Sequence, residues 1–272
     1  MSAPPPRRSG DTDAATPRPP SVSGPVLLDI DGAIARLTLN RPQALNALNR
    51  DVAGALEEAL ERVSRMNGVS VVLVAGRGRA FCAGNDIAEM DELSGAEAET
   101  LAQRFAVIMD HFSRLPQVTI AVIDGYALGG GCMLAVAQDL RIASDRAKFG
   151  LPEVALGFNP GYGIARFLDV VGGGHGRDLL LSGRIIRATE ALRMGLVNRV
   201  VAAPTLEDSA RVWAEEIARS PREGLASTKE IVADIRAGRR GREPEAYGAA
   251  LRTSDAARER IRAFVERKRR AR

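Results

Sequence analysis

The sequence has few of the residues that build disulfides and metal centres. Its 272 residues include only two cysteines and two histidines. Cys82 and Cys132 cannot make a disulfide framework, and His111 and His175 lack the spacing of metal ligands. We therefore predict a protein of a reducing compartment, the cytoplasm, with neither a metal nor a permanently bound cofactor.

Long apolar runs and aromatic side chains are also scarce. No apolar run approaches the roughly 20 residues that a helix needs to cross a bilayer, so we expect no membrane partner. Aromatic residues make up 4% of the chain and hydrophobic residues 45%. This composition predicts a sizeable core of Val, Leu, Ile and Ala. At this length we expect one large α/β domain with an appendage.

Residues 1–24 have little hydrophobicity to fold around. This opening is rich in Pro, Ser and Arg and has no apolar stretch of the kind that a signal peptide contains. Its prolines and two aspartates also argue against a targeting segment. We predict a disordered tail over 1–24.

Basic charge is concentrated at one end of the chain, whose formal net charge is +4. Residues 257–272 hold eight Arg and Lys against two Glu, which leaves the body of the chain slightly acidic. A nucleic-acid-binding protein more often spreads positive charge over a face and interleaves aromatics. We expect no nucleic-acid partner and interpret the basic end as a solvated helix, with a few Arg placed for a phosphorylated small ligand as the alternative.

From residue 25 onward, strand and helix patterns alternate. Segments 25–30 and 33–39 are short strands split by Asp-Gly, which is a hairpin signal, and Asn49 is suited to cap the helix that follows. Further strands are predicted over 69–76, 118–125, 140–144, 147–150 and 195–201, and helices over 49–66, about 95–115, 161–171, 175–183 and directly after the glycines 129–131. Four helical segments without a strand follow. We predict a β/α core over 25–204 and a helical region over 205–272.

Three glycines, Gly129 to Gly131, stand immediately before the helical stretch CMLAVAQ. A helix start leaves several N–H groups unpaired, and its dipole attracts negative charge. Glycine removes the Cβ that would block close approach, so this junction can seat an anion or an oxyanion. Tight packing between strand and helix uses glycine too, and the residues alone leave both interpretations open. The spacing fits neither a phosphate loop nor a dinucleotide-binding fingerprint.

Two other turns carry residues suited to related chemistry. After the strand ending at Ala75, the sequence AGND again precedes a helical start. Two such junctions can place two backbone N–H groups around one oxygen. Glu153 follows Pro152 in an apolar neighbourhood. It is either a surface loop residue or a partly desolvated base with a raised pKa.

Five motifs resemble, in order and spacing, the signatures of the crotonase (enoyl-CoA hydratase/isomerase) superfamily: LNRPQALNALN, GRAFCAGNDIAEM, IDGYALGGGCMLAVAQDLRIAS, FGLPEVALGFNPGYG and AFVERKR. The resemblance covers nearly the whole predicted folded chain. It implies an α/β fold with a β-β-α spiral core and a C-terminal all-helical trimerisation region. It also implies a homo-oligomer, a trimer or a dimer of trimers, and acyl-CoA thioester substrates, so that coenzyme A arrives as part of the substrate.

The resemblance places an oxyanion hole on the backbone N–H groups of Asn85 and Gly130. Removing the weakly acidic proton α to a thioester carbonyl puts negative charge on the carbonyl oxygen. One well-placed donor contributes roughly 3–4 kcal/mol to such a transition state, and a helix N-terminus adds to it. On this interpretation the glycine turn holds the thioester oxygen as it becomes an enolate.

The sequence departs from the family pattern at Met133. In hydratases of the family two glutamates flank the water; the first position falls here on Met133 and the second on Glu153. One carboxylate is enough to move a proton between two carbons on one face, so we predict an enoyl-CoA isomerase with Glu153 as its catalytic base. An enoyl-CoA hydratase or CoA-thioester decarboxylase of the same family is the alternative. A non-catalytic or RNA-binding protein of the same fold is a minor alternative.

The resemblance also assigns residues that contact the substrate. The coenzyme A contacts are Asn85, Asp86, Ile87, Ala88, Gly130, Phe264 and Arg267. The last two match positions that reach the adenine and 3′-phosphate of a neighbouring subunit. Gln43 stands where a lysine is frequent, so one phosphate contact is missing. Candidates for the acyl pocket, with packing or a surface place as the alternative, are Met133, Tyr126, Asn159 and Tyr162. Asp139 is interpreted as structural.

Overall fold

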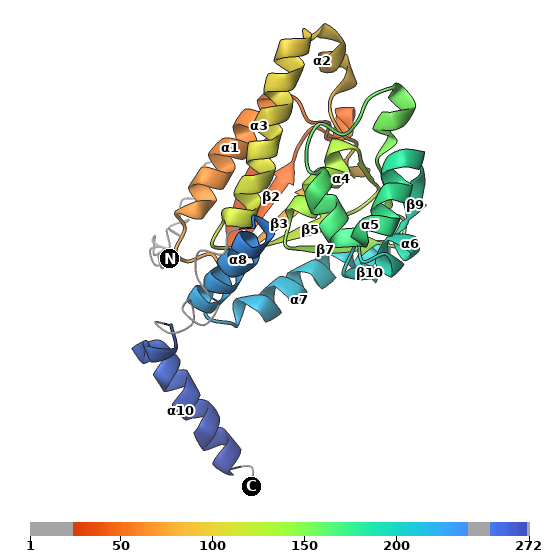
Figure 1. Cartoon of the computed structure of the whole chain (residues 1–272). Helices are drawn as coiled ribbons and strands as arrows, with labels where there is room; N and C mark the ends of the chain where they lie inside the picture. Colours follow the sequence, from red (N-terminus) through yellow and green to blue (C-terminus); the bar gives the residue numbers. More distant parts are fainter. Residues whose placement is uncertain (1–23, 239–250, 271–272) are drawn as a thin grey trace, which may run out of the picture.

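The computed structural model describes residues 24–238 and 251–270 (Figure 1). The predicted disordered tail therefore lies outside the described residues, apart from Gly24. None of the described helices combines the length and the apolar character that a membrane span requires.

Two sheets form the centre of the fold. The larger one has six strands, in the order β1 (Val26–Asp31), β2 (Ile34–Leu39), β3 (Val71–Gly76), β5 (Val118–Ile123), β7 (Leu140–Ser144) and β10 (Arg199–Val201). The smaller one has the order β4 (Ala80–Cys82), β6 (Tyr126–Leu128), β8 (Lys148–Gly150) and β9 (Ile185–Arg187). The pairs β1–β2 and β8–β9 are antiparallel, and all other neighbours are parallel.

The chain passes between the two sheets in a repeated order. β3 and β4 are followed by α2 (Ile87–Glu92) and α3 (Gly95–Arg114), β5 and β6 by α4 (Gly130–Ala137), and β7 and β8 by α5 (Ile164–Ser182). Each helix is the crossover that parallel neighbours require. This order is the β-β-α spiral that the family resemblance implies, and the predicted fold class is confirmed.

The six-stranded sheet is buried on both faces. Val72 and Val74 of β3 belong to the large core that α1 (Arg50–Ser64), α3 and α4 complete, whereas Val71 and Leu73 face a second core. That second core is closed by α7 (Leu206–Ala218), which packs on β3, β5 and β7. Burial on both faces explains why β3 is continuously apolar instead of alternating between apolar and polar residues.

Helix α8 is joined to the end of the sheet through a buried lysine. In α8 (Arg222–Arg236), the Lys229 ammonium lies 2.7 Å from Asp139 Oδ2 and donates to the Gln117 carbonyl at 2.8 Å. Asp139 Oδ2 also accepts from the backbone and side chain of Thr119, which is the structural role expected of this aspartate. Figure 1 shows α10 (Asp255–Arg270) extending away from the sheets. No strand follows β10 in the described residues.

Several local features differ from the sequence-based expectation. The strands β4, β6 and β9 were not expected, because three-residue strands are too short to show a period. By contrast, the two helices predicted over 161–171 and 175–183 are confirmed: they are the two parts of α5, which is interrupted at Gly172 (φ 76°). The strand predicted over 195–201 is limited to β10, and α6 (Ala188–Arg193) precedes it.

Candidate active site

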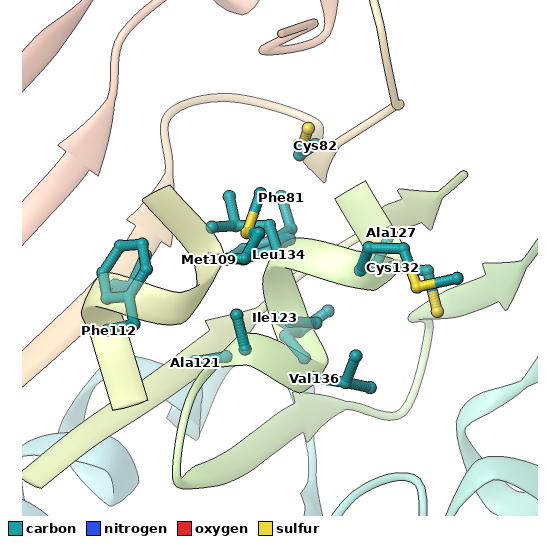
Figure 2. Packing of buried hydrophobic residues seen from close by; sticks show 14 of the residues in the cluster. Phe81, Cys82, Met109, Phe112, Ala121, Ile123, Ala127, Cys132, Leu134 and Val136 are labelled. Atoms are coloured by element: carbon teal, nitrogen blue, oxygen red, sulfur yellow. The ribbon is translucent and has the colours of Figure 1, made fainter. Parts of the chain in front are cut away.

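Helix α4 is held inside the core on all sides. All eight of its residues are buried, and Figure 2 shows Cys132, Leu134 and Val136 packed among side chains of β4, β5, β6 and α3. A Cβ on Gly131 would lie 2.1 Å from the Cys82 carbonyl oxygen, so the approach of α4 to β4 requires glycine there. The position of the helix N-terminus is therefore set by the core.

The first turn of α4 presents an unpaired donor. Gly129 has φ 51°, a left-handed conformation that favours glycine, and its carbonyl accepts from Met133 N at 3.1 Å. The N–H group of Gly130 donates to no acceptor within the described part of the chain. This N–H lies at the positive end of the helix dipole.

A second unpaired donor comes from the loop after β4. Leu48 forms a bridge around Asn85: its N–H donates to Gly84 O at 2.8 Å, and its carbonyl accepts from Asp86 N at 2.9 Å. The N–H of Asn85 itself has no acceptor among residues 24–238 and 251–270. The loop runs close to α4, because a Cβ on Gly84 would lie 3.6 Å from Gly130 N. Two free N–H groups from neighbouring elements can serve as an oxyanion hole.

Glu153 is buried beside the same helix start. It lies in the short 3-10 helix Pro152–Leu156 and is 8% exposed. A Cβ on Gly129 would lie 2.8 Å from its Oε1, and its Oε2 has no hydrogen-bond partner in the part of the chain that is described. Burial raises the pKa of this carboxyl above its ordinary value. Of the two interpretations left open by the sequence, the surface one is wrong and the desolvated carboxyl is present.

Met133 and Tyr162 complete the surroundings of this helix start. Met133 is 1% exposed, and a Cβ on Gly163 would lie 3.0 Å from its sulfur. The Tyr162 hydroxyl donates to Asn85 Oδ1 at 2.7 Å, and burial raises the pKa of this phenol well above its ordinary value. The structure therefore brings Asn85, Gly130, Met133, Glu153 and Tyr162 together.

Other predicted site residues are not joined to this group. Tyr126 begins β6, with the Lys148 ammonium 5.3 Å from its ring centre, and the exposed Asn159 donates to the Pro160 carbonyl. Within the described residues, no hydrogen bond or ring contact links either residue to Glu153, Asn85 or Gly130, and their acyl-pocket role stays a prediction.

The predicted coenzyme A contacts are dispersed over the chain. Asp86 forms a 2.9 Å ion pair with Arg41, and Ile87 and Ala88 are exposed at the start of α2. Phe264 is about half exposed on α10, with the Arg267 guanidinium 5.7 Å from its ring centre. Figure 1 shows α10 well away from α4.

Sequence reasoning missed the residues that support the group. Leu48 aligns the Asn85 loop through its bridge, and Phe105 of α3 stacks on the Tyr162 ring at 5.9 Å between centroids. Both are apolar residues without a local chemical signal, so only their partners in space identify them. Within the described residues, no group of three His, Cys, Asp or Glu side chains is arranged to hold a metal ion.

Comparisons with known proteins find a matching family and similar solved structures. Residues 29–271 match the family model described as enoyl-CoA hydratase/isomerase. The chain is 35% identical over 250 residues to a short-chain-enoyl-CoA hydratase of Clostridium acetobutylicum, and the match covers 89% of this chain and 95% of that one. Similar solved structures include an enoyl-CoA hydratase from Bacillus anthracis (TM-score 0.82, 31% identity, 89% and 96% covered) and an enoyl-CoA hydratase/isomerase family protein from Hyphomonas neptunium (0.85, 33%, 91% and 97%).

Proposed function

Because the chain belongs to the enoyl-CoA hydratase/isomerase family, we propose that it is an enzyme that adds water to the double bond of a 2-enoyl-CoA thioester. The sequence favours a double-bond isomerase, with hydration as the alternative. The names of the similar proteins from Clostridium acetobutylicum and Bacillus anthracis favour hydration. We therefore prefer the alternative.

The observation that carries the proposal is a buried carboxyl next to two unpaired N–H groups. As the oxygen of water bonds to C3, the electrons of the double bond move towards the thioester oxygen, where Asn85 N–H and Gly130 N–H would stabilise the negative charge. Glu153 takes one proton from the water and returns a proton to C2 as the enolate collapses. A carboxyl whose pKa is raised by burial is suited to both transfers.

A specific observation supports isomerisation as the second candidate. Met133 has no proton to exchange and fills its place in the core. Glu153 would then be the only carboxyl for the reaction, and one carboxyl can carry a proton between C2 and C4. Decarboxylation of a malonyl-type thioester passes through the same enolate and is a third outcome to test.

The test is a screen of the purified protein against 2-enoyl-, 3-enoyl- and malonyl-type CoA thioesters in D2O, followed by mass spectrometry. Hydration adds one water, isomerisation moves the double bond at constant composition apart from deuterium that the carboxyl exchanges with D2O, and decarboxylation loses CO2. We expect Glu153→Gln to lower turnover at least ~10²-fold with coenzyme A affinity little changed. Glu215→Gln on the surface of α7 is the matched control. A protein that neither binds nor converts these thioesters would contradict the proposal, and salt-sensitive RNA binding without turnover would favour the non-catalytic alternative.

The proposal also includes the compartment, the oligomeric state and the form in which coenzyme A arrives. We propose that coenzyme A enters as part of the substrate and that the enzyme is a cytoplasmic homotrimer or dimer of trimers. Phe264 and Arg267 would then reach the coenzyme A of a neighbouring subunit. The exposed Phe264 ring and the guanidinium beside it are suited to stacking on adenine and pairing with a phosphate.

A further inference from the structure

We propose that Tyr162 is a positioning residue of the oxyanion hole: its hydroxyl holds the Asn85 side chain against Gly130 and so fixes the two N–H donors relative to each other. The inference rests on the proposed function in one respect, that these donors bind a thioester oxygen. Nothing in the comparisons assigns a role to this tyrosine.

The geometry joins three separate segments at one point. Asn85 belongs to the loop after β4, Gly130 begins α4, and Tyr162 precedes α5. The Tyr162 hydroxyl donates to Asn85 Oδ1 at 2.7 Å. A Cβ on Gly130 would lie 2.4 Å from the tyrosine oxygen and 2.6 Å from the asparagine oxygen. Both oxygens therefore lie directly against the Cα of Gly130, where only glycine leaves room.

The tyrosine is fixed more firmly than the residue it holds. Tyr162 is 6% exposed, and its ring stacks on Phe105, which is 1% exposed. The Asn85 side chain is partly exposed, and its amide nitrogen donates no hydrogen bond in the described part of the chain. Within the described residues, the hydrogen bond from the Tyr162 hydroxyl is thus the only one that holds this amide. Removing it leaves the amide free to rotate and weakens the link between the loop and α4.

Rotation of the amide would affect catalysis electrostatically. A carbonyl oxygen carries partial negative charge, and in a buried site it destabilises an enolate nearby. While the hydroxyl donates to Asn85 Oδ1, this oxygen faces the tyrosine. The phenol stays protonated at working pH because its burial disfavours the phenolate. It remains a donor throughout the reaction.

The experiment compares Tyr162→Phe, Asn85→Ala and the double variant. The first readout is the enolate fraction of a bound β-ketoacyl-CoA, acetoacetyl-CoA, measured by ultraviolet absorbance. Tyr162→Phe keeps the ring on Phe105 and should lower the enolate-to-keto ratio about tenfold, the upper range for one hydrogen bond. Affinity for a coenzyme A thioether, which cannot enolise, should change less than about twofold. In the Asn85→Ala background, Tyr162→Phe should have no further effect on the enolate ratio.

The control is Thr119→Val, which removes a buried hydroxyl bonded to Asp139 at the sheet end near α8. It should leave the enolate ratio unchanged. An unchanged ratio in Tyr162→Phe would overturn the inference. A full effect of Tyr162→Phe in the Asn85→Ala background would overturn it too, because the hydroxyl would then act on the substrate directly.

A second readout needs no substrate. Within residues 84–86, the Asp86 amide donates to the Leu48 carbonyl, and its hydrogen exchange should become several-fold faster in Tyr162→Phe and stay unchanged in Thr119→Val. Equal exchange in Tyr162→Phe and the wild-type protein would contradict the positioning role. If the wild-type protein binds no CoA thioester while the exchange of the Asp86 amide responds as expected, the proposed function fails and the role of Tyr162 in the loop stands.

Discussion

Glu153 is only 8% exposed, and its Oε2 has no hydrogen-bond partner in the described residues. Such a place disfavours the charged form and therefore costs stability at neutral pH. The core around α4 offsets this cost. A carboxyl buried at such a cost is expected at a functional site rather than in a loop that only connects two elements.

The raised pKa of Glu153 gives a pH-dependent prediction. A carboxyl whose pKa is higher in the folded than in the unfolded state contributes stability that is present below the unfolded pKa and lost as pH rises through the folded pKa. Glu153→Gln should therefore be more stable than the wild-type protein at pH 7. The difference should shrink as pH falls towards about 4.3, the ordinary pKa of glutamate. Urea denaturation over a pH series measures it.

Glu215→Gln is the control for this series, because its side chain is on the surface of α7 in an i,i+4 pair with Arg211. Its stability relative to the wild-type protein should vary much less with pH. A stability difference for Glu153→Gln that is the same at every pH would contradict the burial argument.

Met133 gives the second prediction at the scale of one residue. Met133→Glu places a second carboxyl one turn into α4, and two acids around one water can divide the proton transfers of hydration. We expect a small gain in hydration of crotonyl-CoA and a loss of stability on the order of 1–3 kcal/mol, since the new carboxyl is buried. Steady-state kinetics and urea denaturation measure the two effects. Met133→Leu, which stays apolar, should show neither the gain in hydration nor the loss of stability. Efficient hydration by the wild-type protein without any gain in Met133→Glu would show that another group holds the water.

At the scale of elements, the start of α4 depends on glycines that differ in what surrounds them. Gly131 faces the backbone of β4, with the Cys82 carbonyl oxygen 2.1 Å from the place of a Cβ. Gly130 faces the ends of two side chains, those of Tyr162 and Asn85. Backbone of a buried strand moves only with the core, whereas a side-chain end moves by rotation. The two positions should therefore respond differently to the same substitution.

We expect Gly131→Ala to lower the free energy of unfolding by more than about 2 kcal/mol, because β4 and α4 must separate. Gly130→Ala should cost less stability and should lower α-proton exchange of a bound thioester, because it displaces Asn85 and Tyr162. Gly174→Ala in α5 is the control, since a Cβ there meets nothing within 4 Å. Urea denaturation and proton exchange by NMR measure the effects. Equal losses of stability at 130 and 131 would contradict the argument.

At the scale of the whole molecule, the C-terminal helices expose apolar side chains. Ile235 of α8 is 65% exposed, and Ile261, Phe264 and Val265 of α10 are 54%, 48% and 40% exposed. These apolar residues lie on helices that also carry many charged side chains. A surface of this kind is stabilised when another chain covers it.

We therefore expect a trimer or hexamer in light scattering at micromolar concentration. The double variant Phe264→Ser with Val265→Ser should shift the molecular mass towards the monomer. Val107→Ser on α3, at a position that is 70% exposed, is the control and should leave the mass unchanged. A wild-type protein that is a stable monomer at this concentration would contradict the prediction.

Local features of the chain could be predicted from the sequence because they depend on near neighbours. Asn49 caps α1 by accepting from Val52 N, the Asp-Gly turn joins β1 to β2, and Gly129 has the positive φ that a glycine turn allows. The five family motifs are also linear patterns, so they predicted the family and the spiral order of strands and helices. They further placed Glu153, Asn85 and Gly130 among the site residues.

The tertiary structure decided which residues these site residues contact. Whether Glu153 is on the surface or buried depends on how closely the 3-10 helix approaches α4, which no local pattern contains. Tyr162 and Asn85 are 77 positions apart in the chain, and their hydrogen bond exists because α3 holds the tyrosine ring over the start of α4. Periodicity and turn chemistry act over a few residues, whereas burial, pKa and unpaired donors depend on which distant segment packs alongside.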